Sequence, residues 1–242
     1  MSNIVSDAIK KLQKGEYGQH RYVSYHAPRY TLLVDVLRGV IQPGARVLDI
    51  GKSLLSSFIA AEFQVKVDTL GFQSDGPTDV GQHWHFDLND SQQRSTWRTD
   101  IGPYDVIVMA EVIEHLHTSP ALVLAFLNSI LAPSGKLVIQ TPNAVALHKR
   151  VEMLVGRHPY TPINEDALDP SHFREYTKTE LYDYLERAGF SVTNCVAGQY
   201  FDYRFTRAGM KPYLSVVNLA YRFLPTQLKP GLTLVTTKVR EA

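Results

Sequence analysis

Tyr104-Asp-Val-Ile-Val-Met-Ala-Glu-Val-Ile-Glu-His-Leu-His117 is the stretch on which the fold depends. It opens with an apolar, β-branched run, which is typical of a strand buried on both faces, and it ends abruptly in charged residues. Val47-Leu-Asp-Ile-Gly51 has the same character. In an open α/β sheet, ligands bind beyond the carboxyl ends of the strands. We therefore expect one pocket to be lined by Asp49, Gly51, Glu111, Glu114 and His115.

The bulk composition is that of one α/β domain with appendages. The chain has 242 residues, of which 44% are hydrophobic, and 25 Lys and Arg balance 24 Asp and Glu. A net charge of +1 gives no global field for nucleic acid. Cys195 is the only cysteine, which excludes an intrachain disulfide and fits a reducing compartment. No apolar run approaches the ~18 residues of a membrane span, so we expect a cytoplasmic protein. The oligomeric state stays open.

A third block follows the first two in order and spacing: Leu131-Ala-Pro-Ser-Gly-Lys-Leu-Val-Ile-Gln-Thr-Pro-Asn143. Together the three blocks resemble the class I S-adenosylmethionine-dependent methyltransferases over roughly residues 30 to 195. The resemblance implies a Rossmann-like α/β fold, with a mostly parallel seven-stranded sheet and helices on both faces. It also implies S-adenosylmethionine as the cofactor.

The chain divides into two parts. We expect residues 1–30 to form an N-terminal helical or lid segment, with an amphipathic stretch at 4–12 and many tyrosines, histidines and arginines. This aromatic and cationic segment suits either packing over the core or closure over a polar substrate. Residues 31–242 are expected to form a single methyltransferase domain with a cap insertion at about 143–172.

Hydrophobic periodicity, together with proline and capping residues, predicts the remaining helices and strands. Pro28 suits the first turn of a helix, and Leu147, Val151, Leu154 and Val155 share one face of another. Thr177-Lys-Thr-Glu180 is a capping box that opens a third helix. Strands are predicted at 45–50, 64–70, from His83, and at 104–109, 136–141, 190–197 and 231–239. A further apolar stripe runs from Tyr213 to Leu224 and is more often a core face than a partner surface.

The segment after Asp49 departs from the family. These methyltransferases usually have several closely spaced glycines there, and only Gly51 is present. Lys52 and Ser53 could still make the turn. Ser53, Ser56 or Ser57 could cap the next helix, whose amides would face the methionine carboxylate. The alternative is that the cofactor site has been lost.

The resemblance assigns further cofactor contacts. An acidic residue should accept bonds from the ribose hydroxyls, and Asp75 fits this position slightly better than Asp68. Asp87-Leu88 falls where the adenine amine is bound, and Ala110 and Glu111 follow the fourth strand beside the cofactor. Trp97 or Phe72 could cover the adenine, although core packing suits both better.

Three chemically active side chains stand together after the fourth strand. Glu111, Glu114 and His115 share one side if a helical turn begins at Glu111. In one interpretation His115 is a general base that Glu114 or Glu111 orients. In a second, Glu111, Glu114, His115 and His172 bind magnesium or manganese, with zinc or iron as competitors. In a third, Glu111 contacts cofactor or backbone, Glu114 caps, and His115 packs in the core.

His172 enters through the block Ser171-His-Phe-Arg-Glu-Tyr-Thr177. The pairing of Glu-Val-Ile-Glu-His with this later block is similar to the small-RNA 2′-O-methyltransferases, which place a metal with such a set. The first block alone also resembles the ubiquinone-pathway O-methyltransferases. Many family members that act on sugars or other small metabolites have both blocks. His115, Glu114 and His172 are therefore the candidate catalytic residues.

Acceptor chemistry follows from these groups. An alcohol must lose a proton during methyl transfer, and a nearby base contributes ~10²–10⁴-fold. The sequence therefore predicts an S-adenosylmethionine-dependent O-methyltransferase that acts on a hydroxyl of a small metabolite, such as a sugar or glycan precursor. One alternative is a non-catalytic binding module that retains the fold. Another is an RNA-modifying enzyme, which would rest on Lys149, Arg150 and Arg157.

Overall fold

The structure is a computed structural model that describes residues 20–72, 80–160, 162–165, 171–201 and 223–242. Its strands are β1 (Val47–Ile50), β2 (Val67–Gly71), β3 (His83–His85), β4 (Tyr104–Ala110), β5 (Leu131–Pro142), β6 (Phe190–Gly198) and β7 (Gly231–Lys238). Its helices are α2 (His20–Leu37), α3 (Leu54–Phe63), α4 (Pro120–Ser129), α5 (Leu147–Leu154) and α6 (Lys178–Arg187). Short 3₁₀ turns include η1 (Leu88–Gln92) and η3 (Ile113–His115). Every strand expected from the sequence is present.

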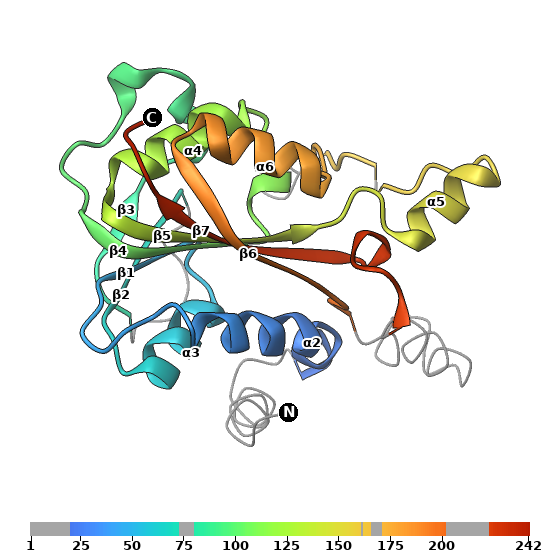
Figure 1. Ribbon diagram of the computed structural model, residues 1–242, viewed down its shortest axis with the longest axis horizontal. Helices are drawn as coiled ribbons and strands as arrows, with labels where there is room; N and C mark the ends of the chain where they lie inside the picture. Colours follow the sequence, from blue (N-terminus) through green and yellow to red (C-terminus); the bar gives the residue numbers. More distant parts are fainter. Residues whose placement is uncertain (1–19, 73–79, 161, 166–170, 202–222) are drawn as a thin grey trace.

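The strands form one seven-stranded sheet in the order β3-β2-β1-β4-β5-β7-β6. The pairs from β3 to β5 are parallel, and β7 runs antiparallel to both β5 and β6. Helices α2 and α3 cover one face, and α4 and α6 cover the other (Figure 1). The predicted Rossmann-like fold is confirmed.

Strand β4 shows why the sheet is buried on both faces. Val106 and Val108 pack in the core formed with α2 and α3, whereas Ile107 and Met109 pack in the core formed with α4 and α6. All four side chains are buried, because successive strand residues point to opposite faces and a helical layer covers each face. The apolar run therefore ends where the covering layers end, at Ala110.

Helix α2 begins earlier than the sequence predicts. Pro28 lies inside the helix, not in its first turn, and the expected boundary at residue 30 falls within the same helix. Leu33 and Leu37 of the same helix are fully buried against the sheet. This packing holds the C-terminal half of α2, so the interruption at Pro28 is tolerated.

Helix α5 presents its apolar side outward. Leu154 is 85% exposed and Val151 is 50% exposed, whereas Lys149 is only 6% exposed. The shared apolar face is real, but it faces away from the described body of the protein. Figure 1 shows α5 projecting beyond the carboxyl end of β5.

Some predictions fall on residues that the structure does not describe. These are the amphipathic stretch at 4–12, Asp75, the part of the cap insertion at 166–170, and the apolar stripe up to Tyr221. Within the described ranges, no helix has the length and hydropathy needed to span a membrane.

Asp68 is a cross-strand anchor. Its Oδ1 accepts a hydrogen bond from the Gln82 backbone N–H at 2.8 Å, and its Oδ2 accepts one from the Tyr104 hydroxyl at 3.0 Å. Tyr104 in turn accepts from Trp84 Nε1 at 2.8 Å. Asp68 therefore ties β2 to β4 and to the segment leading into β3, and both carboxylate oxygens are used.

Asp68→Asn should lower the free energy of unfolding by about 1–3 kcal/mol, because one buried partner loses its acceptor. Affinity for S-adenosylhomocysteine should stay within about twofold. Urea unfolding and calorimetric titration measure the two quantities, with Asp183→Asn on the exposed side of α6 as the control. A large loss of affinity without a loss of stability would instead make Asp68 a ligand of the cofactor.

Candidate active site

Open space, called the hollow below, lies beside the backbone of Gly51 at the carboxyl end of β1. Gly51 has a φ of 90°, and a Cβ added there would meet nothing within 4 Å. Its N–H donates to the Leu70 carbonyl at 2.8 Å, and a Cβ at Gly71 would lie 3.7 Å from the Gly51 Cα. Leu55, which could have filled this space, is buried in the core with α2 and α3. The backbone at Gly51 is therefore accessible.

Hydroxyl groups shape the turn where the family usually has glycines. Ser53 caps α3 by accepting from the Leu55 N–H, and the Ser53 N–H donates to Ser56 Oγ, both at 3.2 Å. Ser56 Oγ donates to Asp49 Oδ2 at 2.7 Å. The prediction that serines cap this helix is confirmed. These bonds fix the turn and leave the N-terminus of α3 beside the hollow.

Asp49 is buried with one oxygen unsatisfied. Only 1% of the residue is exposed, and Oδ1 has no hydrogen-bond partner among the described residues. Burial raises the pKa of Asp49 to about 8, although the bond from Ser56 opposes the shift. A buried acceptor without a partner, next to an open hollow, is suited to a ligand.

Other predicted cofactor residues lie around the same edge. Asp87 caps η1 by accepting from the Asn89 N–H at 2.9 Å, and Leu88 is buried directly after it. Ala110 ends β4, and Lys52 is half-buried after β1. Trp97 packs edge-on against Phe126 in the core, as expected, whereas the same expectation is wrong for Phe72, which is 47% exposed.

Glu111 does not begin a helical turn. Its φ is 56°, in the left-handed region, so the predicted spacing on one helical side is wrong. Its N–H donates to the Gln140 carbonyl at 2.7 Å, which holds the residue against β5. Its Oε2 pairs with Arg29 Nη1 of α2 at 2.9 Å, and both side chains are largely buried. Burial raises the pKa of Glu111, and Arg29 opposes that shift.

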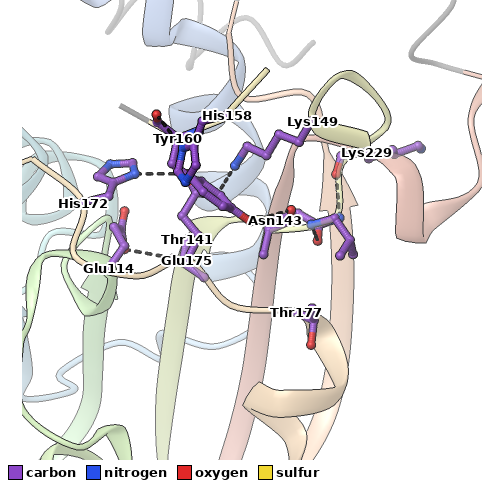
Figure 2. Close-up of polar contacts among 12 residues, drawn as sticks. Glu114, Thr141, Asn143, Lys149, His158, Tyr160, His172, Glu175, Thr177 and Lys229 are labelled. Carbon is purple, nitrogen blue, oxygen red and sulfur yellow. Dashed lines mark hydrogen bonds and ion pairs between the residues drawn. The ribbon is translucent and has the colours of Figure 1, made fainter. Parts of the chain in front are cut away.

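A second cluster forms beyond β4. Ligand atoms of Glu114, His115 and His172 all lie within 4.8 Å of one another. Glu114 is fully buried, and its Oε2 accepts from the Thr141 hydroxyl at 2.8 Å, while Oε1 has no partner among the described residues (Figure 2). Burial, and then the neighbouring Glu111, hold the pKa of Glu114 well above its usual range. The structure thus brings together three of the four predicted ligands.

Hydrogen bonds fix both imidazoles of the cluster. His115 Nδ1 lies 2.9 Å from the Ser171 carbonyl, and His172 Nδ1 lies 3.1 Å from Glu175 Oε1. A carbonyl and an ionised carboxylate only accept, so each Nδ1 donates, and in the neutral imidazole the lone pair is then at Nε2. A nitrogen with a lone pair can take a proton or bind a metal.

Two further residues complete the site and were not predicted. Glu175 Oε2 pairs with Lys149 Nζ of α5, and both side chains are buried (Figure 2). The Lys149 ammonium also lies 5.2 Å from the centre of the Tyr160 ring. Burial lowers the pKa of Lys149 to about 8, against the attraction of Glu111 and Glu114. The sequence did contain one indication of the contact between Glu175 and His172, because the two residues are three positions apart.

A family profile described as "Methyltransferase domain" matches residues 22–194. The chain belongs to the class I S-adenosylmethionine-dependent methyltransferases. Over 88 residues, it is 33% identical to a probable S-adenosylmethionine-dependent methyltransferase of Mycolicibacterium smegmatis. That match covers 36% of this chain and only 29% of the relative.

Solved structures share the fold of this methyltransferase. A SAM-dependent methyltransferase from Archaeoglobus fulgidus matches with a TM-score of 0.56 and 17% identity, over 86% of this chain and 94% of its own. The 1,6-didemethyltoxoflavin-N1-methyltransferase of Burkholderia thailandensis, solved with S-adenosylhomocysteine, matches with a TM-score of 0.55 and 13% identity. It covers 98% of this chain and 88% of its own. At these identities the likeness concerns the fold alone.

The residues at the end of β1 fit S-adenosylmethionine. The open space beside Gly51, the unsatisfied Asp49 Oδ1 and the N-terminus of α3 are the features that such a cofactor requires. No atom of the described residues lies within 4 Å of a Cβ built at Gly51, so the space beside its backbone is not filled.

Gly51→Ala should weaken S-adenosylhomocysteine binding about tenfold or more, because the methyl group would project into the hollow. Gly44→Ala is the matched control, since Gly44 has a φ of 78° and equally open surroundings before β1. Both variants should lose about 1 kcal/mol of stability from backbone strain. Calorimetric titration checks the difference, and equal affinities in the two variants would place the cofactor elsewhere.

Asp49→Asn should change how stability depends on pH in the cofactor-free protein. Folding raises the pKa of Asp49 from 3.8 to about 8, so the folded protein binds a proton that the unfolded chain releases. Wild-type stability should therefore fall as the pH rises through this window, by on the order of a few kcal/mol relative to Asp49→Asn. Urea unfolding at about pH 5 and about pH 8 measures this, with the exposed Asp35→Asn as the control. An equal difference at both pH values would contradict the assignment.

Proposed function

We propose that this methyltransferase transfers the methyl group to a hydroxyl of a small acceptor, such as a sugar or glycan precursor. The observation that carries the proposal is the cluster of Glu114, His115 and His172, with ligand atoms within 4.8 Å of one another. It follows β4, and the hollow at Gly51 follows the neighbouring strand β1. Acceptor and methyl donor would therefore meet at one edge of the sheet.

The chemistry of the transfer explains the cluster. A bond forms between the acceptor oxygen and the methyl carbon, while the bond from that carbon to the sulfonium sulfur breaks. The hydroxyl proton must leave, and Nε2 of His115 or His172 carries a lone pair that can take it. Protonated His172 would then be stabilised by the carboxylate of Glu175, 3.1 Å from its Nδ1. Acceptors that are already nucleophilic need no such base.

The same three residues would hold a divalent metal. Two imidazoles and a buried carboxylate with one unsatisfied oxygen are a fitting donor set, and Glu111 is engaged by Arg29. The set is richer in nitrogen than the predicted set of four ligands, which favours manganese, iron or zinc over magnesium. Such an ion would lower the pKa of a coordinated hydroxyl.

The alternatives have less support. The RNA-modifying interpretation relied on Lys149, Arg150 and Arg157. Only the two arginines are exposed, because Lys149 is buried against Glu175. A non-catalytic module would not need a base beside the methyl donor. The toxoflavin-pathway neighbour methylates a nitrogen according to its name, but 13% identity does not carry that acceptor to this chain.

The direct test incubates the full chain with S-adenosylmethionine and a panel of sugars, glycan precursors, amines and RNA, and measures S-adenosylhomocysteine release. We expect turnover with a hydroxyl acceptor. His115→Gln and His172→Gln should each lower kcat by about 10²–10⁴ without changing S-adenosylhomocysteine affinity. His117→Gln is the matched control, because His117 is exposed and lies outside the cluster. Turnover confined to amines, and indifferent to both variants, would contradict the proposal.

Metal dependence is measured in the same assay. If a metal is bound, a chelator should abolish turnover, and manganese should restore it. Full activity in the presence of chelator would leave the histidines as a metal-free base and remove the metal from the proposal.

A further inference from the structure

A chain of charged contacts leads from α5 to the cluster. Lys149 Nζ pairs with Glu175 Oε2, and Glu175 Oε1 lies 3.1 Å from His172 Nδ1 (Figure 2). Both oxygens of the Glu175 carboxylate are therefore used. The Glu175 side chain is 5% exposed and that of Lys149 is 7% exposed, so little water screens the contacts.

The orientation of α5 does not follow from hydrophobic burial. Turning the helix over would bury Val151 and Leu154 and expose Lys149, as usual for an amphipathic helix. Burial of an ion pair also carries a desolvation penalty that its attraction only partly offsets. The observed orientation has one evident result, which is to bring a cation to Glu175.

The two histidines are held by different means. His115 donates to the Ser171 carbonyl, whose place is set by the backbone. The segment 171–175 is fixed against η3, since the Phe173 N–H donates to the Glu114 carbonyl at 2.9 Å. His172 instead donates to a side chain, and the direction of that side chain depends on Lys149. His172 is thus the member of the cluster whose proton position depends on a charged pair.

We propose that Glu175 and Lys149 are positioning residues for His172. Glu175 accepts the Nδ1 proton and so keeps the lone pair of the neutral imidazole at Nε2. Lys149, which can only donate, occupies the other oxygen and holds the carboxylate in this orientation. The inference deepens the proposed function, on which it rests for the role of the cluster.

The proposal predicts which nitrogen of His172 carries the proton in Glu175→Gln. An amide has only one acceptor oxygen, and Lys149 should take it. The amide NH₂ would then face His172 Nδ1, which must become the acceptor, and the proton moves to Nε2. In Lys149→Met/Glu175→Gln nothing competes for the amide oxygen, so it can turn to His172 and restore the proton at Nδ1. A merely structural role predicts no such reversal.

The readout is the histidine tautomer, measured by long-range ¹H–¹⁵N correlation spectra of the metal-free full chain. The His172 signals are assigned by comparison with His172→Gln. We expect the Nδ1–H form in wild type, the Nε2–H form in Glu175→Gln and the Nδ1–H form again in the double variant. Manganese affinity should fall about 10–100-fold in Glu175→Gln and recover in the double variant. The matched controls are Glu186→Gln in α6 and Arg150→Met in α5, because both side chains are exposed.

An Nε2–H form in wild type, or an unchanged tautomer in Glu175→Gln, would overturn the proposal. Failure of the double variant to restore the tautomer would remove Lys149 from it. If Glu175→Gln does not fold, the His172 tautomer in wild type and in the double variant still tests the proposal. The double variant buries no unpaired charge and is therefore expected to fold. The tautomer is read without acceptor or metal, so its outcome is independent of whether a hydroxyl acceptor is found. S-adenosylhomocysteine affinity should stay unchanged throughout.

Discussion

The fully buried carboxylate of Glu114 is the constraint on which the active-site edge depends. A carboxylate without water must be compensated by hydrogen bonds, by opposite charge or by a proton. The Thr141 hydroxyl supplies one bond, and the backbone of Glu114 receives the segment that carries His172. The same residue therefore joins β4, β5 and the segment before α6. The two imidazoles approach it because that segment is fixed against η3.

The proposed cofactor edge differs in sequence from the pattern that is usual in the family. Where several glycines would allow close approach of a ligand to the backbone, this chain has one glycine and a run of hydroxyls. Ser53 and Ser56 satisfy the turn and orient Asp49, so backbone accessibility is required only at Gly51. Local hydrogen bonding thus substitutes for conformational freedom.

Features that depend on interactions between residues close in sequence could be predicted, and features that depend on distant residues could not. The strands were predictable because burial on both faces requires uninterrupted apolar runs, as in Val106 to Met109. The capping box at Thr177 was predictable because its partners are three residues apart. The left-handed Glu111 pairs with Arg29, and α5, whose apolar face points outward, pairs with Glu175 through Lys149; both partners lie far away in the chain. Periodicity gives the apolar face of a helix but not the direction in which that face points.

The distribution of buried charge favours a reacting site over a purely structural edge. Three buried carboxyl groups lie at or just beyond the carboxyl ends of β4 and β5: Glu111 pairs with Arg29, Glu175 pairs with Lys149, and Glu114 has no ion pair with any described residue. Buried ion pairs are often no more stabilising than well-packed apolar side chains of similar volume. An edge built for stability alone would therefore have no need of them. The proposed hydroxyl acceptor, which must lose a proton as it attacks, would use groups held in this way.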